Sequence, residues 1–141
     1  MGEKEIKDGN LWIAEFIGWT FDVKDGQVKC YFNGKLRWQD TERFMVQLFN
    51  SESGFAYHLK WEQLMPVVEK IEVLQSPLFQ KVWVSINGNE CSIWTYFDVS
   101  EALRTQHQDG KFKIKRSSKS KITATWLAVT DFLTWYNQQQ K

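Results

Sequence analysis

The chain has 141 residues, of which 43% are hydrophobic and 25% charged, and its net charge is +1. This length is typical of one domain, and the composition is that of a globular protein with a buried core, which excludes an intrinsically disordered chain. The near-zero net charge excludes a whole-molecule attraction to DNA, membranes or acidic substrates, so an argument from charge has to be local.

The first ten residues are polar and mixed in charge, and we expect a flexible leader over residues 1–10, followed by a single α+β domain over residues 11–141. The leader lacks the apolar run of a signal peptide. No apolar stretch approaches the roughly 18 to 20 residues that cross a bilayer as a helix. The sequence therefore predicts a cytoplasmic protein that makes no contact with a membrane.

Residues 11–18 are nearly all apolar, and periodicity leaves a buried strand and a short helix both open. Apolar and polar residues then alternate, and the dipeptides Asp25-Gly26 and Asn33-Gly34 favour tight hairpin turns. We therefore expect a three-stranded antiparallel meander over residues 18–39. For residues 40–58 helix and strand both stay open.

An amphipathic helix is expected from Trp61 onward, because apolar residues recur there at intervals of three and four. Pro66 lacks an amide proton, so this helix starts near it or bends there. A second hairpin follows over residues 82–97, and the polar segment 98–110 is expected to be a loop or lid.

Lysines alternate with apolar residues over 111–115, which predicts one further strand, paired with the second hairpin. The clearest helix covers residues 122–136, with Ser118 or Ser120 as its N-cap. We therefore expect an α+β fold with one antiparallel sheet of about five to six strands, made of the meander, the hairpin and the single strand. Two main helices would cover one face of this sheet in a two-layer sandwich.

The cysteines and histidines give little sign of chemistry. Cys30 and Cys91 lie in apolar runs, where a free thiol behaves as a small hydrophobe. His58 and His107 lie in unrelated contexts, so a Cys/His metal site lacks ligands. Motifs for nucleotide-binding loops and zinc hydrolysis do not occur in the sequence. We expect no catalytic residue, no metal and no cofactor, and an enzyme with a site near His58 or His107 is the third hypothesis.

A basic segment is the most suggestive local feature, with six basic residues and no acid among the eleven of 111–121. If Phe112 and Ile114 face the core, the lysines between them form a cationic stripe near the N-terminus of the last helix, which suits phosphate. The competing interpretation is a solvated edge strand, where lysines discourage aggregation. The candidate ligand-binding residues are Lys111, Lys113, Lys115, Arg116, Lys119, Arg104, Trp94 and Tyr96.

The eight tryptophans are unusual for a chain of this size. Each aromatic ring buries on the order of 150 to 250 Å², so core filling is the ordinary interpretation. One or two rings in a groove could instead stack on a base, a sugar or a partner side chain. A nucleic-acid interface would need such rings interleaved with the basic residues, and Trp83, Trp94 and Tyr96 are able to supply them.

Three stretches, residues 13–18, 57–72 and 128–137, carry a resemblance that spans nearly the whole chain. The most specific motifs are Trp-x-x-Leu-Met-Pro-Val-Val-Glu-Lys-Ile-Glu, from Trp61, and Phe-Leu-x-Trp-Tyr-Asn. With them the chain resembles short uncharacterised proteins of bacteria and their phages. The resemblance implies a phage-type accessory protein in the host cytoplasm, a setting in which small non-enzymatic inhibitors are common. Lys60 departs from the pattern, since a serine able to cap the helix tends to precede the motif.

Our leading hypothesis is a non-enzymatic small binding protein of phage type that sequesters or blocks a nucleotide-like anionic ligand or a host protein, for instance in counter-defence. A nucleic-acid-binding module is the alternative, and salt-dependent binding to a generic oligonucleotide would favour it. The many aromatic residues also allow a homo-oligomer formed through a hydrophobic surface.

Overall fold

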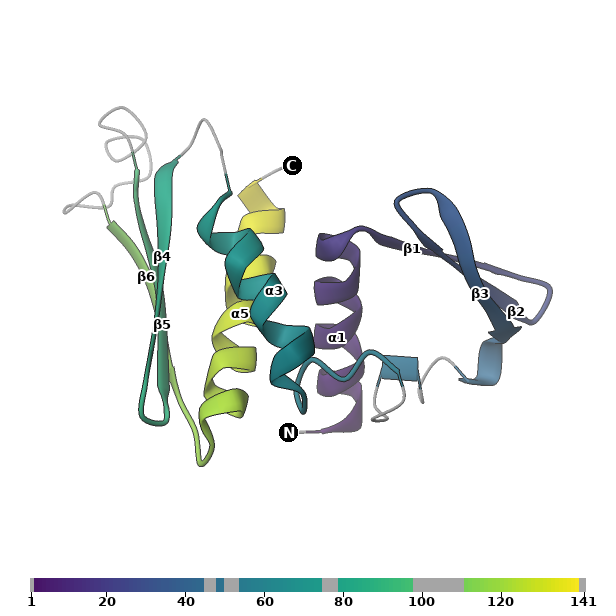
Figure 1. Ribbon diagram of the computed structural model, residues 1–141, viewed down its shortest axis with the longest axis horizontal. Helices are drawn as coiled ribbons and strands as arrows, with labels where there is room; N and C mark the ends of the chain where they lie inside the picture. The colour runs from purple at the N-terminus through teal and green to yellow at the C-terminus, as the bar shows by residue number, and fades with distance from the viewer. Residues whose placement is uncertain (1, 45–47, 50–53, 75–78, 98–110, 140–141) are drawn as a thin grey trace. The chain divides into compact units, whose positions relative to one another are not determined.

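The computed structural model describes residues 2–44, 48–49, 54–74, 79–97 and 111–139 of the chain. Within these ranges the fold is α+β, with two three-stranded antiparallel sheets (Figure 1). The contacts gather in two compact units, residues 1–63 and 64–141, and the single domain expected over residues 11–141 stays a prediction. None of the helices in the described ranges is long and apolar enough to cross a membrane.

The first unit begins with a helix that is followed by a meander. Its elements are α1 (Glu3–Ile17), β1 (Trp19–Lys24), β2 (Gln27–Phe32), β3 (Lys35–Thr41) and the short 3-10 helix η1 (Glu42–Phe44). Asp25 and Asn33 have φ angles of 54° and 51°, so both tight turns use the left-handed conformation that these residues tolerate. The strand order β1-β2-β3 confirms the meander predicted over residues 18–39.

Helix α1 occupies most of the segment expected to be a flexible leader, and residues 11–17, for which strand and helix were both open, belong to the same helix. Its buried residues are Gly9, Asn10, Ile13 and Ala14, which recur on one side of the helix. It ends at Gly18, whose φ of 127° excludes most other residues and whose amide donates to the carbonyl oxygens of Ala14 and Glu15. The sequence concealed this helix because glycine and asparagine are poor helix formers.

Aromatic rings form the core of the first unit. Trp19 and Phe21 on β1 meet rings from the segment after β3, with the Trp19 and Phe55 centroids 4.9 Å apart and those of Phe21 and Phe49 5.3 Å apart. Both pairs are edge-to-face, an arrangement that aromatic pairs favour. The meander therefore covers its apolar face with residues of its own unit.

The second unit contains the other sheet and two helices. Its elements are α3 (Trp61–Glu72), which starts at the unit boundary, β4 (Phe79–Asn87), β5 (Glu90–Phe97), β6 (Lys111–Ser117) and α5 (Lys121–Gln139). The strand order β4-β5-β6 confirms both the predicted second hairpin and the pairing of the basic strand with it. The amphipathic pattern of α3 is confirmed by its buried residues, Leu64, Val67, Val68 and Ile71.

The prediction of a single sheet is wrong, because the six described strands form two separate sheets. Alternation along a strand identifies its two faces, but it does not say which strands pair across a long intervening segment. The apolar face of the meander packs against Phe49 and Phe55.

Helix α5 packs on one face of the sheet β4-β5-β6 (Figure 1). Phe112 on β6 stacks on Trp135 of the helix, with ring centroids 4.0 Å apart. Ser120 is the N-cap: its hydroxyl accepts a hydrogen bond of 3.2 Å from the Thr123 amide. The two-layer sandwich with both main helices on this one face stays a prediction.

Candidate functional site

Strand β5 separates two faces of the second sheet. Cys91, Ile93 and Thr95 are completely buried, whereas Tyr96 is 43% exposed and Trp94 is half-buried. Successive side chains of a strand point to opposite faces. The buried set therefore belongs to the face that α5 covers, and Trp94 and Tyr96 belong to the opposite, outer face.

The pairing of β6 with β5 carries this division to the basic strand. Lys113 lies directly opposite Trp94, and Lys115 lies opposite Ser92. Directly opposed residues of an antiparallel pair share a face. Both lysines are exposed on the outer face, and the alternate positions Phe112 and Ile114 belong to the helix face, in the arrangement that the alternation of 111–115 suggested.

Strand β4 adds a second aromatic ring and a further lysine to the outer face. Trp83 pairs with Trp94, and the two rings are nearly parallel, with an interplanar angle of 12° and centroids 6.3 Å apart. Trp83 also meets Tyr96 edge-on at 5.6 Å. The exposed Lys81 places its ammonium group 5.8 Å from the centre of the Trp83 ring, within the range of a cation–π interaction.

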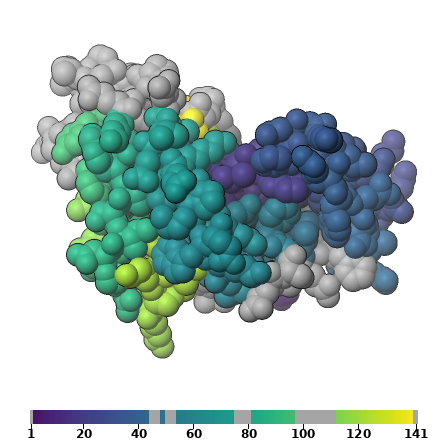
Figure 2. Space-filling view, in the orientation of Figure 1, coloured from purple at the N-terminus to yellow at the C-terminus, as the bar shows by residue number. Residues whose placement is uncertain are grey.

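Together these residues form what we call the aromatic-basic face, defined as Lys81, Trp83, Trp94, Tyr96, Lys113 and Lys115. Three rings lie on the neighbouring strands β4 and β5, and lysines lie on β4 on one side and on β6 on the other. Atoms in the green range of the colour bar, which includes β5 and β6, lie at the molecular surface in the space-filling view (Figure 2). Lys81 is not among the residues predicted from the sequence, although the alternation from Lys81 to Ser85 is a signal for its place on this face.

The lysines of this face differ in their surroundings. Lys115 approaches the carboxylate of Glu90, with 3.6 Å between Nζ and Oε2, and both side chains are about half exposed. No ion pair of Lys113 occurs within the described ranges. The surface pair between Lys115 and Glu90 contributes little to stability and is screened by salt. Among the described residues, Lys81 and Lys113 therefore lack the carboxylate partner that Lys115 has.

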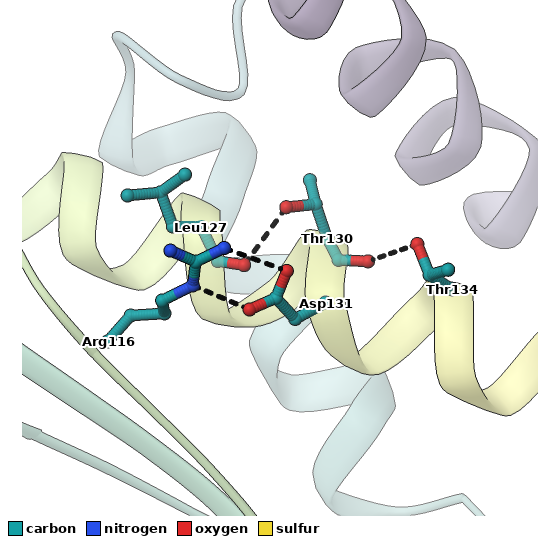
Figure 3. Close-up of polar contacts among 5 residues, drawn as sticks. All are labelled: Arg116, Leu127, Thr130, Asp131 and Thr134. Carbon is teal, nitrogen blue, oxygen red and sulfur yellow. Dashed lines mark hydrogen bonds and ion pairs between the residues drawn. The ribbon is translucent and has the colours of Figure 1, made fainter.

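Arg116 does not belong to the aromatic-basic face, although it was among the candidates. It lies opposite the buried Cys91 and reaches toward α5, where it forms two hydrogen bonds with the Asp131 carboxylate, of 2.6 and 3.2 Å (Figure 3). A bidentate pair of this kind fixes geometry as well as charge. Arg116 thus ties β6 to α5, and the basic run contributes to both faces of the sheet.

The remaining candidates are placed as follows. Lys119 is exposed between β6 and α5, and its carbonyl oxygen accepts a hydrogen bond from the Asn89 side chain. Lys111 lies opposite Tyr96 in the strand register and is described by its backbone. Arg104 lies outside the described residues, as does the expected loop 98–110.

The sequence predicts that the N-terminus of α5 forms part of an anion site. One of its first-turn amides is already satisfied within the chain, since the Thr123 amide donates to the Ser120 hydroxyl. A capped first turn has fewer free donors to offer a ligand. The aromatic-basic face is therefore the better candidate.

The titratable groups considered for catalysis lie away from solvent where they are described. His58 is buried, and burial lowers its pKa. Burial raises the pKa of the Cys30 thiol and of the Cys91 thiol to about 11, so neither forms the reactive thiolate at neutral pH. His107 lies outside the described residues. Among the residues that the structure describes, no three metal-ligating side chains come together.

Comparison of the chain with protein-family models, with curated proteins and with solved structures finds no match. The assignment of a function therefore depends on the geometry and chemistry of the chain itself.

Proposed function

We propose that this chain is a non-enzymatic small binding protein of phage type, and that it captures a nucleotide-like anionic ligand on the aromatic-basic face of its second sheet. Capture alone would sequester the ligand or block its other partners. The proposal assigns no chemical step to the protein, because the face offers stacking surfaces and positive charge.

The observation that carries this proposal is the combination of three aromatic rings with lysines on either side of them. Trp83, Trp94 and Tyr96 present ring surfaces on two adjacent strands. Aromatic rings stack on planar groups such as bases, while lysines attract phosphate oxygens. A nucleotide-like ligand contains both kinds of group, so one molecule would use both parts of the face.

A purely structural role explains part of the same surface. A cross-strand Trp83–Trp94 pair stabilises a hairpin, and lysines on the edge strands β4 and β6 discourage aggregation. Edge protection explains the lysines without requiring rings beside them. Hairpin stabilisation needs one ring pair, whereas Tyr96 adds a third ring that keeps 43% of its surface exposed. A ligand accounts for all of these residues at once.

A thermal-shift experiment tests the proposal with ATP and inorganic triphosphate as probes. A ligand that binds the folded state raises the melting temperature by mass action. We expect ATP to raise it, and the double substitution Lys113→Gln with Lys115→Gln to reduce that rise. The control, Lys24→Gln with Lys35→Gln, removes the same charge from exposed positions in the first unit and should retain the rise.

The absence of any shift in melting temperature would contradict the proposal. If neither probe nor a short oligonucleotide shifts the melting curve of the unmodified protein, the lysines are a solvated edge and the proposed anion binding is wrong. A partner would then have to be sought among proteins.

A further inference from the structure

We infer that the ligand of the aromatic-basic face is a single-stranded nucleic acid, whose bases stack on Trp94 and Tyr96 while its phosphates lie along β6. This inference depends on the proposed function, since it names the class of anion that the same face would take. Three observations lead to it: the exposure of ring surfaces, their repeat along β5 and the lysine positions opposite them.

The exposed Tyr96 and the half-buried Trp94 favour unpaired bases. Stacking on a protein ring requires a base whose flat surface is accessible, and in a duplex these surfaces are covered by the neighbouring base pairs. A duplex offers its phosphates and groove edges instead, which call for a larger positive surface. The near-neutral chain, with a net charge of +1, does not provide one. A single strand suits the rings, and a short one suits the charge.

The repeat along the strands favours a polymer over a mononucleotide. Trp94 and Tyr96 are two residues apart on β5, about 6 to 7 Å at the usual rise of a strand. Each lies opposite a lysine position of β6, Trp94 opposite Lys113 and Tyr96 opposite Lys111. A ring with a lysine position beside it therefore occurs twice in succession. A nucleic-acid strand repeats in the same way, with one base and one phosphate per unit.

Strand β4, on the other side of β5 from β6, adds a ring and a lysine to the aromatic-basic face. Trp83 lies nearly parallel to Trp94 and carries Lys81 near its ring. A strand crossing β5 onto β4 would therefore meet a third ring and a further cation. Because every base has a flat surface, recognition of this kind is tolerant of sequence. We expect binding to depend on strandedness more than on sequence.

The charge of the face sets the expected salt dependence. Three lysine side chains, Lys81, Lys113 and Lys115, are exposed there. Each neutralised phosphate of a single strand contributes about −0.7 to the slope of log affinity against log salt concentration, so three contacts predict a slope of about −2. A strongly steeper slope would require cations from elsewhere on the protein.

Fluorescence anisotropy with the full chain tests the inference. The probes are labelled twelve-nucleotide oligo-dT and oligo-U strands, a labelled duplex of the same length, and ATP as a competitor. We expect both single strands to bind, the duplex to bind at least tenfold more weakly, and ATP to compete only at high concentration. Trp94→Val keeps an apolar strand-forming residue and should weaken single-strand binding about fivefold or more, the loss expected for one stacked base.

Matched variants separate the ring effect from general damage. Trp38→Val removes a ring that is 36% exposed on the first sheet and should leave the affinity unchanged. Lys113→Gln, a surface substitution with no described ion pair to break, should weaken binding and flatten the salt slope, even if Trp94→Val fails to fold.

The outcomes distinguish the inference from the proposed function. If ATP binds and Lys113→Gln weakens it, but single strands bind no more tightly than ATP, the face binds an anion and the inference of a nucleic acid is wrong. If single strands bind and neither Trp94→Val nor Lys113→Gln weakens them, the aromatic-basic face is not the site and both statements fail. If no probe binds, both fail as well.

Discussion

The buried histidine of the first unit accepts a hydrogen bond that its charged form cannot accept. Nδ1 of His58 lies 2.9 Å from the side-chain amide nitrogen of Asn10, Nδ2, which also donates a hydrogen bond to the Phe49 carbonyl oxygen. An amide nitrogen is a donor, so Nδ1 has to be the acceptor and the ring has to be neutral, with its proton on Nε2. The histidine connects α1 with the segment before α3, and this connection depends on its protonation state.

The stability of the first unit should therefore depend on pH. Burial lowers the pKa of His58 in the folded state, whereas in the unfolded chain it is about 6.5. The unfolded state binds the proton more readily, so protonation favours unfolding. We expect the free energy of unfolding to be fully maintained above about pH 6.5 and to decrease as the pH falls below that value.

Urea unfolding at pH 7.5 and at pH 5.5 measures this effect, with His58→Gln as the comparison. The variant cannot take up the proton, so the difference in free energy between the two pH values should be smaller than in the unmodified chain. Equal differences in the two proteins would show that His58 does not contribute to the pH dependence.

Among the secondary-structure elements, α5 begins with a defined cap. The Ser120 hydroxyl accepts a hydrogen bond from the Thr123 amide, and it also lies 2.7 Å from the Thr123 hydroxyl, to which it donates. Ser120→Ala should lower the free energy of unfolding by about 0.5 to 2 kcal/mol, the usual effect of losing a serine cap. Ser118→Ala is the control, since Ser118 bonds Asn89 through its backbone amide. Chemical denaturation of both variants decides the point, and equal losses would contradict the assignment.

Much of the strand structure was predictable because its signals are local. The tight turn at Asn33 and the alternation of lysines with Phe112 and Ile114 fix short hairpin and strand segments without reference to distant parts of the chain. The spacing of apolar residues in the last helix is local in the same sense. The outer-face positions of Trp94, Tyr96 and Lys113 could be expected from these patterns.

The remaining features depend on contacts between distant residues. Helix α1 includes Gly9 and Asn10, which disfavour a helix locally, and Asn10 is held by partners 39 and 48 residues away. Arg116 belongs to the basic run by sequence, yet its partner Asp131 lies on another element. The division of the strands into two sheets is likewise a matter of long-range pairing. None of these can be read from spacing alone.

At the scale of the whole molecule, each compact unit has its own central strand. β2 pairs with both β1 and β3, and β5 pairs with both β4 and β6. Val28 and Cys30 on β2 are buried, as are Cys91 and Ile93 on β5. Backbone amides of central strands with buried side chains open least often.

Hydrogen exchange should therefore show two separate maxima of protection. We expect the slowest exchange in peptides from β2 and from β5 together with α5, and faster exchange in the edge strands β1, β3 and β4. Mass spectrometry of peptides after timed exchange measures this pattern. A single protected region confined to one unit would contradict this expectation.

The alternation along β5 and β6 has a consequence for how such a protein can change over generations. Residues that contact α5 and residues that face outward occupy separate positions of the same strands, so a substitution on one face leaves the packing of the other intact. A lineage can therefore replace the residues of the outer face step by step while keeping its fold. For the same reason the outer face is a natural set of positions for a randomised library, from which new binders could be selected on an unchanged scaffold.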